Sequence, residues 1–515
     1  MNGVQILLII GAGIAVSAVA RRRGLEPGLI IVVLAAAASF IPGMPPLKLD
    51  SEVILALVIP PLLYSATRGA SFSTFGANLR PILSLGVFLV VLTTGALGVI
   101  SSWLIPSLGL AAAFVLGAIL APPDTITTVS HGDEIGLPKR ATSILTGESL
   151  VNDATALTLF AIAVAAVNGE HSTWIGGVGE FFRNAGIGVA IGALFAVLTL
   201  WIRKRLHNPT LETALVLLLP FTAFLAAEAF HASGILAVVV ASFSVSGNLT
   251  LDPKHQYPGA YLTRLQEDGV WPVVDFLLET FVFAYIGLQL KFVLVDLAES
   301  EEPGLGRTLF AAGVLLLAAI VVRLAGVYGL FGRWTMEERR RRRQLARHPE
   351  LQERLDRLAE RRTRDGRQRA KPLDPPTPKE TFLVGWTGMR GILTLAAAAS
   401  VPELTRAGQP FPGRSAIQAI ALIVTLGTLL IQGTTLRWVS RLLKIDLSAE
   451  RAAATKMVER GAEIVRSVPG TTDADFDQQR AALSKGVFDG TLDEETAKKL
   501  IEDVDLRQAA RHTGD

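Results

Sequence analysis

Residues 147–157 of the chain read GESLVNDATAL, at the start of a long apolar segment, 142–167. In a helix, residues four positions apart share a face, so Ser149 lies with Asp153, and Glu148 lies with Asn152. Two carboxylates, an amide and a hydroxyl thus occupy about two helical turns. Oxygen ligands of this kind suit a hard cation, and an ionisable residue inside a membrane span is a functional candidate. The stretch predicts a cation site inside a membrane helix.

The rest of the sequence fits a membrane protein. Of the 515 residues 50% are hydrophobic and only 18% are charged, whereas a soluble protein has about 25% charged residues. The mean hydropathy is +0.43. Many of the apolar segments approach the ~20 residues that a helix needs to cross a bilayer. We count about thirteen, at 4–20, 28–41, 52–66, 81–105, 109–130, 142–167, 181–202, 211–230, 232–247, 270–290, 308–332, 380–400 and 413–436. The sequence predicts an all-α polytopic membrane protein.

Charge gives the expected orientation in the membrane. The net charge is +3, and most basic residues lie in alternate turns between the apolar segments. This pattern indicates the orientation of a membrane protein, and we expect no nucleic-acid partner. The residues that follow this pattern are Arg21–Arg23, Arg68, Arg80, Lys139, Arg140, Arg203, Lys204, Arg205, Lys254, Arg264 and the run Arg339–Arg343. The exceptions are Lys48, Arg183, Lys291, Arg307, Arg406 and Arg414. No basic residue precedes the first apolar segment, so we expect a retained span and no cleaved signal peptide. The N-terminus is expected outside and the C-terminus in the cytoplasm.

Two polar regions flank the last apolar segments. The loop 333–379 is Arg-rich with helical spacing, and we expect it to form a charged helix against the headgroups of membrane lipids. Residues 445–515 are polar and helix-prone. We expect a transmembrane antiporter domain over 1–440 and a small helical cytosolic tail over 445–515. The tail has two possible roles, as a regulatory unit or as a solvated appendage without a function of its own.

A second polar cluster interrupts the fifth apolar segment. Residues 121–125 read APPDT, and two successive prolines break a helix because they lack the N–H group and clash with the preceding turn. Broken helices near the bilayer centre are where transporters bind ions. Asp124 is therefore a second candidate ligand. The alternative is a proline kink in which Asp124 only caps the freed N–H groups.

A third cluster interrupts the twelfth segment. Residues 385–391 read GWTGMRG, where three glycines surround Arg390 and allow the backbone to approach closely. A buried arginine needs an anionic partner, and Glu148 or Asp124 would serve. Arg323 in the eleventh segment is a second candidate partner for Glu148. The alternative is that Arg390 is only a structural counter-ion.

The positions of the two interruptions favour a transporter. If the seventh segment links two halves of six segments, then segments five and twelve occupy equivalent places, as expected for two inverted repeats. A passive cation channel with an acidic filter is a less favoured alternative. An enzyme is not expected, because the sequence shows no Ser/His/Asp or metal–histidine arrangement, and no cofactor is expected. The chain has no cysteine, which excludes disulfides and Cys-ligated metals.

Residues 122–157 and 385–395 closely resemble the cation:proton antiporter one family, which includes prokaryotic sodium/proton antiporters and animal sodium/proton exchangers. The resemblance covers about 1–440. It implies thirteen helices in two inverted six-helix repeats, crossed broken helices in a core domain, and a homodimer joined through the other domain. It also implies the plasma membrane of a prokaryote, a role in pH homeostasis, and electroneutral exchange, since an Asn–Asp pair replaces two adjacent aspartates.

Carried over by residue, the family's Na+ ligands fall on Asp153, Asp124 and Ser149, with Asn152 contributing less directly and orienting the aspartates. The family's buried ion pair falls on Glu148 with Arg390 or Arg323. The chain departs from the family at two positions: Pro123 stands where threonine is common, and Ser65 stands where an acidic residue often follows a run like 60–64. We expect exchange of Na+ or Li+ for H+ by competition at Asp153, with K+/H+ exchange as the alternative.

Overall fold

The fold is built from helices. The computed structural model describes residues 3–23, 27–42, 51–68, 72–124, 137–169, 174–251, 260–299, 304–348 and 374–514. Within these ranges there is no strand, and one isolated bridge joins Leu404 and Pro410. The expected all-helical class is confirmed.

Eight helical stretches in the described ranges are long and apolar enough to cross a membrane: Gln5–Arg22, Leu79–Leu104, Lys139–Val167, Phe182–Leu206, Pro209–Ala229, Ala260–Glu299, Leu305–Arg347 and Arg414–Leu443. Three shorter apolar helices lie at Pro27–Ser39, Pro106–Leu120 and Gly234–Gly247. Each of the thirteen expected ranges overlaps at least one helix. The number of spans and the two inverted repeats remain predictions.

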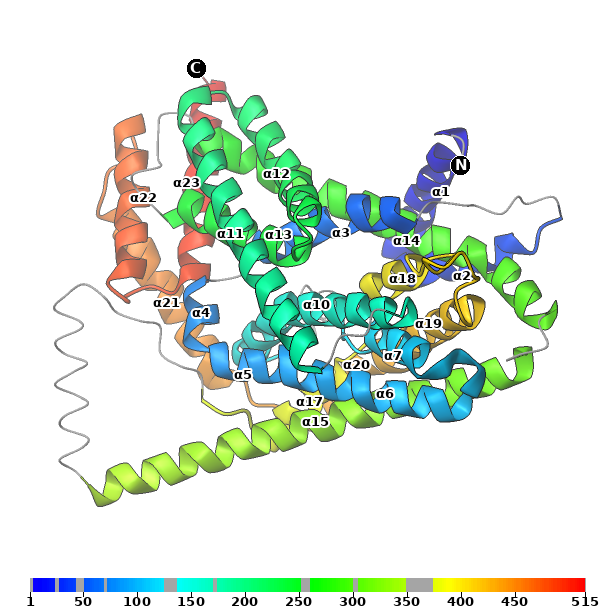
Figure 1. Cartoon of the computed structure of the whole chain (residues 1–515). Helices are drawn as coiled ribbons and strands as arrows, with labels where there is room; N and C mark the ends of the chain where they lie inside the picture. The colour runs from blue at the N-terminus through cyan, green and yellow to red at the C-terminus, as the bar shows by residue number, and fades with distance from the viewer. Residues whose placement is uncertain are drawn as a thin grey trace.

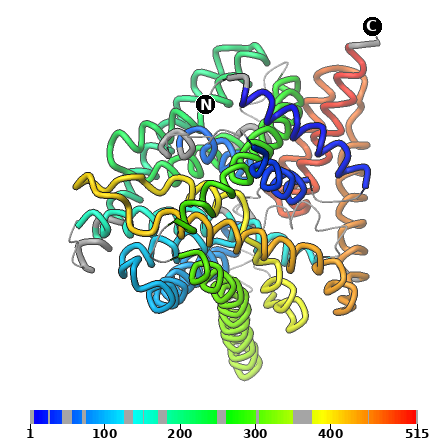
Figure 2. Tube along the Cα trace, turned by 90° about the vertical axis from the view of Figure 1, so that its right-hand side faces the viewer, coloured from blue at the N-terminus to red at the C-terminus, as the bar shows by residue number. Residues whose placement is uncertain are grey.

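The membrane helices form two groups, which contact each other mainly where residues 392–428 pack on α3 (Ser51–Arg68) and α14 (Ala260–Glu299) (Figures 1 and 2). The first group, hereafter the core group, contains α6 (Val90–Leu104), α7 (Gly109–Leu120), α10 (Lys139–Val167), α15 (Leu305–Arg347), α17 (Pro378–Trp386), α18 (Ile392–Ala399), α19 (Arg414–Thr428) and α20 (Thr434–Leu443). The second, hereafter the scaffold group, contains α1 (Gly3–Arg22), α2 (Pro27–Ser39), α3 (Ser51–Arg68), α11 (Trp174–Leu206), α12 (Pro209–Ala229), α13 (Gly234–Leu251) and α14 (Ala260–Glu299).

Packing within each group follows the apolar segments. In the core group α7 packs on α6 and α10, and α15 packs on α17 and α19. In the scaffold group α13 packs on α11, α12 and α3, while α14 packs on α2. Short elements lead into α6: α4 (Phe72–Ala77), α5 (Leu79–Leu83) and a π-helical turn, η1 (Ser84–Leu89), with a 3₁₀ turn, η2 (Pro106–Leu108), after it. A second π-helical turn, η4 (Leu429–Gly433), joins α19 to α20.

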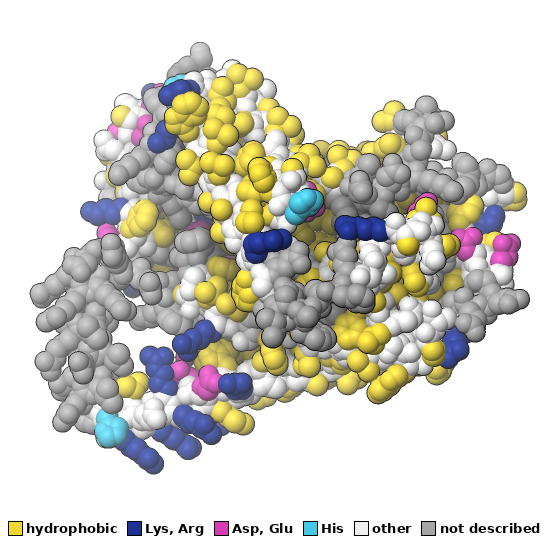
Figure 3. Space-filling model, viewed as in Figure 1, with side chains coloured by type: hydrophobic (Ala, Val, Ile, Leu, Met, Phe, Trp, Pro, Cys, Tyr) yellow, Lys and Arg dark blue, Asp and Glu magenta, His cyan; other side chains and the backbone are white. Residues whose placement is uncertain are grey.

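The eleventh segment differs from its expected length. We expected an apolar stretch at 308–332 followed by a separate Arg-rich loop helix, but α15 runs unbroken from Leu305 to Arg347 and contains the whole run Arg339–Arg343. Arginine is a good helix former, so the helix continues where its residues change from apolar to charged. Figure 3 shows Lys and Arg side chains gathered at this projecting end of α15, and hydrophobic side chains over α11–α13. The remaining loop residues, 349–373, lie outside the described ranges.

The tail forms its own helical unit. Helices α21 (Ser448–Arg466), α22 (Asp473–Phe488) and α23 (Glu494–Gly514) surround a small core that includes Phe476, Leu483 and Ile501. Helix α23 of this unit packs on α14, and the unit lies at the left edge of the molecule in Figure 1. Arg264 of α14 donates to both carboxylate oxygens of Asp505 at 2.7 and 2.8 Å. The tail is thus attached to the scaffold group by an ion pair whose carboxylate is buried.

Candidate ion-binding site

The motif on α10 presents two different faces. Glu148 and Asn152 are fully buried in the protein, whereas Ser149 and Asp153 line a cavity of about 190 Å³. This division follows the helical spacing, since each pair lies four residues apart. One face of the motif therefore holds the structure together, and the other faces a space that an ion can enter.

The interruption of the fifth segment is held by the buried face of α10. Helix α7 ends at Leu120, and Pro122, Pro123 and Asp124 are not helical. The side-chain amide of Asn152 donates to the carbonyl of Pro123 at 2.9 Å. This bond fixes the broken backbone beside the motif, while the Asn152 side chain itself is not in the cavity wall. Residues 125–136, where the second half of this segment was expected, lie outside the described ranges.

The interruption of the twelfth segment crosses the first one. Residues 387–391 separate α17 from α18, and the N–H group of Asp124 donates to the carbonyl of Met389 at 2.7 Å. Gly391 lies so close to Asp124 that a methyl group added to its Cα would overlap the carboxylate. A glycine is thus required at this position by the close approach of the two interrupted segments.

Arg390 has partners that the sequence did not predict. We expected a carboxylate, from Glu148 or Asp124, but Arg390 has no ion pair with either one among the described contacts. Its Nε donates to the carbonyl of Leu120 at 2.5 Å, and Nη1 donates to the carbonyl of Gly388 at 2.6 Å. The Leu120 carbonyl is left without a helical partner where α7 ends, because a helix leaves its last four carbonyls unpaired. The buried guanidinium satisfies the backbone that the interruptions expose.

Glu148 pairs instead with Arg323 of α15. Both terminal nitrogens of Arg323 donate to the Glu148 carboxylate, one to each oxygen, the second at 3.0 Å. The two side chains are only 3% and 0% exposed. Gly388 packs directly against the Arg323 side chain. The ion pair therefore joins α10, α15 and the second interruption at one buried point, and it decides between the two arginines that the sequence left open.

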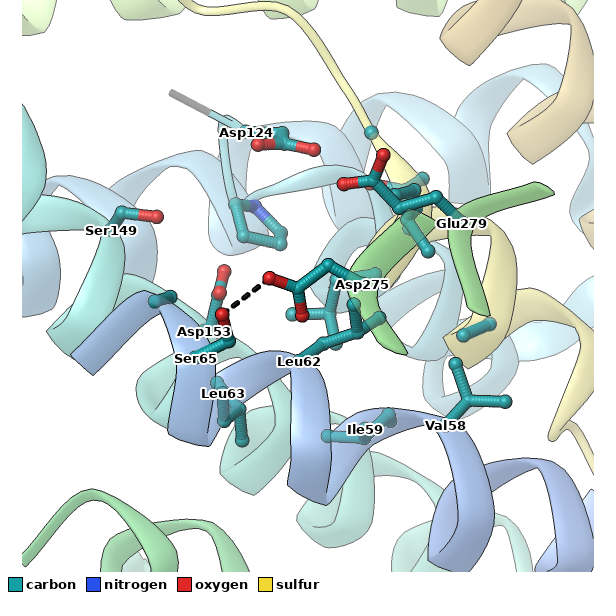
Figure 4. Close-up of a pocket in the computed structure, with 17 residues that line it drawn as sticks. Val58, Ile59, Leu62, Leu63, Ser65, Asp124, Ser149, Asp153, Asp275 and Glu279 are labelled. Carbon is teal, nitrogen blue, oxygen red and sulfur yellow. Dashed lines mark hydrogen bonds between the residues drawn. The ribbon is translucent and has the colours of Figure 1, made fainter. Parts of the chain in front are cut away.

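The cavity lies where the core group faces the scaffold group (Figure 4). Asp124, Ser149, Asp153 and Gly391 form its core-group wall, with Ile392, Leu393, Thr394, Ala396 and Pro122. The scaffold-group wall comes from α3 and α14 and includes Ser65, Asp275 and Glu279. In Figure 4 the carboxylates and Ser149 point toward the same space. The three candidate Na+ ligands Asp153, Asp124 and Ser149 thus share one cavity.

Two cavity residues have no role in the sequence-based prediction. Asp275 and Glu279 lie within the tenth segment, but their partners were unassigned. Their spacing of four residues puts them on one face of α14. That pattern was visible in the sequence, but only the packing of α14 shows that this face meets the cavity.

Comparisons with known proteins show which family the chain resembles. Residues 5–442 match the family model described as sodium/hydrogen exchanger, transmembrane. A protein of Mycobacterium tuberculosis named an uncharacterized Na+/H+ exchanger is 31% identical over 445 residues, which cover 85% of this chain and 74% of that protein. A Bacillus subtilis protein named a sodium, potassium, lithium and rubidium/H+ antiporter is 30% identical, with 77% of this chain and 54% of that one covered.

The solved structure of the sodium proton antiporter MjNhaP1 from Methanocaldococcus jannaschii at pH 8 is similar in fold, with a TM-score of 0.58. It is 15% identical, and the match covers 86% of this chain and 98% of that one. From the family model, which spans most of the sequence, this chain belongs to the sodium/hydrogen exchanger family, whose members are secondary transporters of monovalent cations and not enzymes.

Proposed function

We propose that this protein exchanges Na+ or Li+ for H+, with the cation and the proton competing for Asp153. The observation that supports this proposal best is the single cavity lined by Asp153, Asp124 and Ser149 beside the two crossed interruptions. A carboxylate inside a membrane span is costly and marks an ion or proton pathway. The buried partners behind it, Glu148 and Asn152, are already engaged by Arg323 and Pro123.

Competition follows from the chemistry of the carboxylate. When Asp153 is deprotonated, it binds a dehydrated cation together with Asp124 and the Ser149 hydroxyl, because hard cations prefer oxygen ligands. When Asp153 takes up a proton, its charge is lost and the cation leaves. The neighbouring position is Asn152, which carries no charge, so one cation exchanges for one proton and the cycle is electroneutral. The core group then moves against the scaffold group and presents the site to the other side of the membrane.

Potassium/proton exchange is a second candidate. The oxygen ligands do not by themselves select ion size, and the Bacillus subtilis relative is named for potassium as well as for sodium and lithium. Pro123 and Ser65 stand where the family resemblance leads us to expect threonine and an acidic residue, so ion preference is the property most open to change in this chain.

The test uses purified protein in proteoliposomes that contain a pH-sensitive dye. We expect proton movement when Na+ or Li+ is added, saturation with cation concentration, and no effect of membrane potential. Asp153→Asn is expected to abolish this movement, while Asp296→Asn, an exposed carboxylate on α14, leaves it unchanged. Exchange by Asp153→Asn at the wild-type rate would refute the mechanism. A response to K+ equal to that for Na+ would favour the second candidate, and a non-saturating, potential-driven flux would indicate a channel.

The setting of the transporter is also a proposal. We propose a homodimer joined through the scaffold group in a prokaryotic plasma membrane, with the N-terminus outside and the C-terminus in the cytoplasm. The basic end of α15 and the tail lie on the same side in Figure 1, as the charge rule requires of a cytoplasmic side. A role in pH homeostasis fits exchange of this kind.

A further inference from the structure

Asp275 lies in the scaffold-group wall of the cavity, opposite the residues that carry the proposed exchange. It belongs to α14, whereas Asp124 and Asp153 belong to the core group. Figure 4 shows the Asp275 carboxylate directed toward the space that Asp153 also faces. The cavity thus has acidic side chains on both walls, and the two walls belong to the two groups that have to move past each other.

The Asp275 carboxylate is held in a defined orientation. The hydroxyl of Ser65 on α3 donates a hydrogen bond to Oδ2 of Asp275. The ring of Tyr64, which precedes Ser65 on α3, stacks on the ring of Trp271, one helical turn before Asp275 on α14, with the centroids 4.6 Å apart. Tyr64 is 0% exposed and Trp271 is 2% exposed. This buried contact fixes α3 against α14, so Ser65 meets Asp275 through packing and not by chance.

The second oxygen of Asp275 is left without a hydrogen bond. Oδ1 is buried and accepts no hydrogen bond from the described residues. A buried carboxylate oxygen without a partner is costly, since its desolvation is not compensated. A carboxylate that is oriented at one oxygen and unsatisfied at the other, at the edge of a cavity, is arranged to meet a positive charge in that cavity.

Asp275 does not complete a closed metal cage. Among the described residues, no group of three or more His, Asp or Glu side chains is placed to hold a metal ion together. Asp275 instead faces Asp124 and Asp153 from the opposite wall of the cavity. A carboxylate on the low-dielectric wall of a narrow cavity raises the local concentration of cations there.

We infer that Asp275 is a cation-recruiting residue on the scaffold side of the transport site, and that Ser65 orients it. This inference rests on the proposed function. Asp275 supplies negative charge at the place where the cation enters the site, while Asp153 carries the exchange itself. The acidic residue that the resemblance places on α3 is thus replaced by a serine on α3 and a carboxylate on α14. Asp275 sets the affinity for the cation, and it is not required for the exchange step.

The experiment compares exchange kinetics of Asp275→Asn with those of Asp296→Asn in proteoliposomes. Both substitutions remove one carboxylate from α14, but Asp296 is exposed and outside the cavity. We expect Asp275→Asn to raise the apparent KM for Na+ about tenfold, the scale of one lost charged interaction, with turnover at saturating Na+ retained. Ser65→Ala keeps the Asp275 carboxylate but removes the hydrogen bond that orients it, and it is expected to raise KM by a smaller factor. Asp275→Glu is expected to keep KM within about threefold of wild type.

Two results would overturn the inference. One is a KM for Asp275→Asn that equals that of wild type and Asp296→Asn. The other is lost turnover with unchanged KM, because a group that recruits the cation acts before the exchange step. If Asp275→Asn does not fold, Ser65→Ala decides by the same KM criterion. Exchange by Asp153→Asn would refute the proposed function. If Asp153→Asn is inactive and Asp275→Asn has the KM of the wild-type protein, only this inference is refuted.

Discussion

The ion pair between Glu148 and Arg323 gives a prediction whose size follows from burial. Arg323→Gln removes the positive partner of a carboxylate that is 0% exposed and that receives both terminal nitrogens of the arginine. Breaking one side of a buried ion pair leaves an uncompensated charge and costs about 3–5 kcal/mol. We expect Arg323→Gln to lower the thermal stability of the purified protein strongly, and to do so even though residue 323 does not line the cavity.

The matched control lies on the same helix. Arg342 pairs with Glu338 at 3.0 Å, but its side chain is 63% exposed. Exposed pairs of this kind contribute about 0.2–1 kcal/mol. Arg342→Gln therefore removes the same side chain from α15 at little cost. The assay heats both variants in detergent and measures the folded fraction by size-exclusion chromatography.

A double variant separates lost charge from lost packing. Glu148→Gln/Arg323→Gln leaves two neutral amides that can hydrogen-bond each other, so we expect it to be more stable than Arg323→Gln alone. The difference measures the cost of the orphaned carboxylate, since contacting residues in one network are not additive. The reasoning is refuted if Arg323→Gln loses no more stability than Arg342→Gln, or if the double variant is less stable than the single one.

Two further predictions concern the crossing and the tail. Gly391→Ala is expected to reduce exchange at least about tenfold, because the added methyl group displaces Asp124. Gly306→Ala, whose methyl group meets open space on α15, is expected to leave the rate unchanged. Equal rates for the two variants in the vesicle assay would contradict the importance of this contact. Asp505→Asn removes the buried carboxylate that Arg264 of α14 and Arg480 of α22 share, and it is expected to cost about 3–5 kcal/mol and to speed limited proteolysis between α20 and α21. Asp503→Asn, exposed on the same helix, serves as its control, and identical cleavage rates would show that the tail does not depend on the Asp505 carboxylate.

The sequence predicted the parts of the site that depend on local spacing. Helical periodicity alone placed Ser149 and Asp153 on one face and Glu148 and Asn152 on another, and the structure has this division. The two prolines before Asp124 and the glycines around Arg390 predicted the two interruptions. Such features follow from what each residue permits its own backbone to do.

The sequence could not predict which distant groups meet. Glu148 and Arg323 are 175 positions apart, and both arginine candidates satisfied the same need for charge. The backbone partner of Arg390 exists only because the first interruption crosses the second and leaves the Leu120 carbonyl unpaired. Likewise, the face of α14 that bears Asp275 could have met lipid, α2 or the cavity. These outcomes depend on tertiary packing, for which one sequence carries no direct signal.

The central claim, that Na+ and H+ compete for Asp153, is tested most directly by proton release on cation binding. Saturating Na+ is added to purified protein in a weakly buffered detergent solution, and the pH change is followed with an indicator dye. We expect wild type to release protons, up to one for each chain, with the apparent Na+ affinity weakening as the starting pH is lowered, and Asp153→Asn to release none. Sodium binding by wild type without proton release, or the same release from Asp153→Asn, would contradict the account.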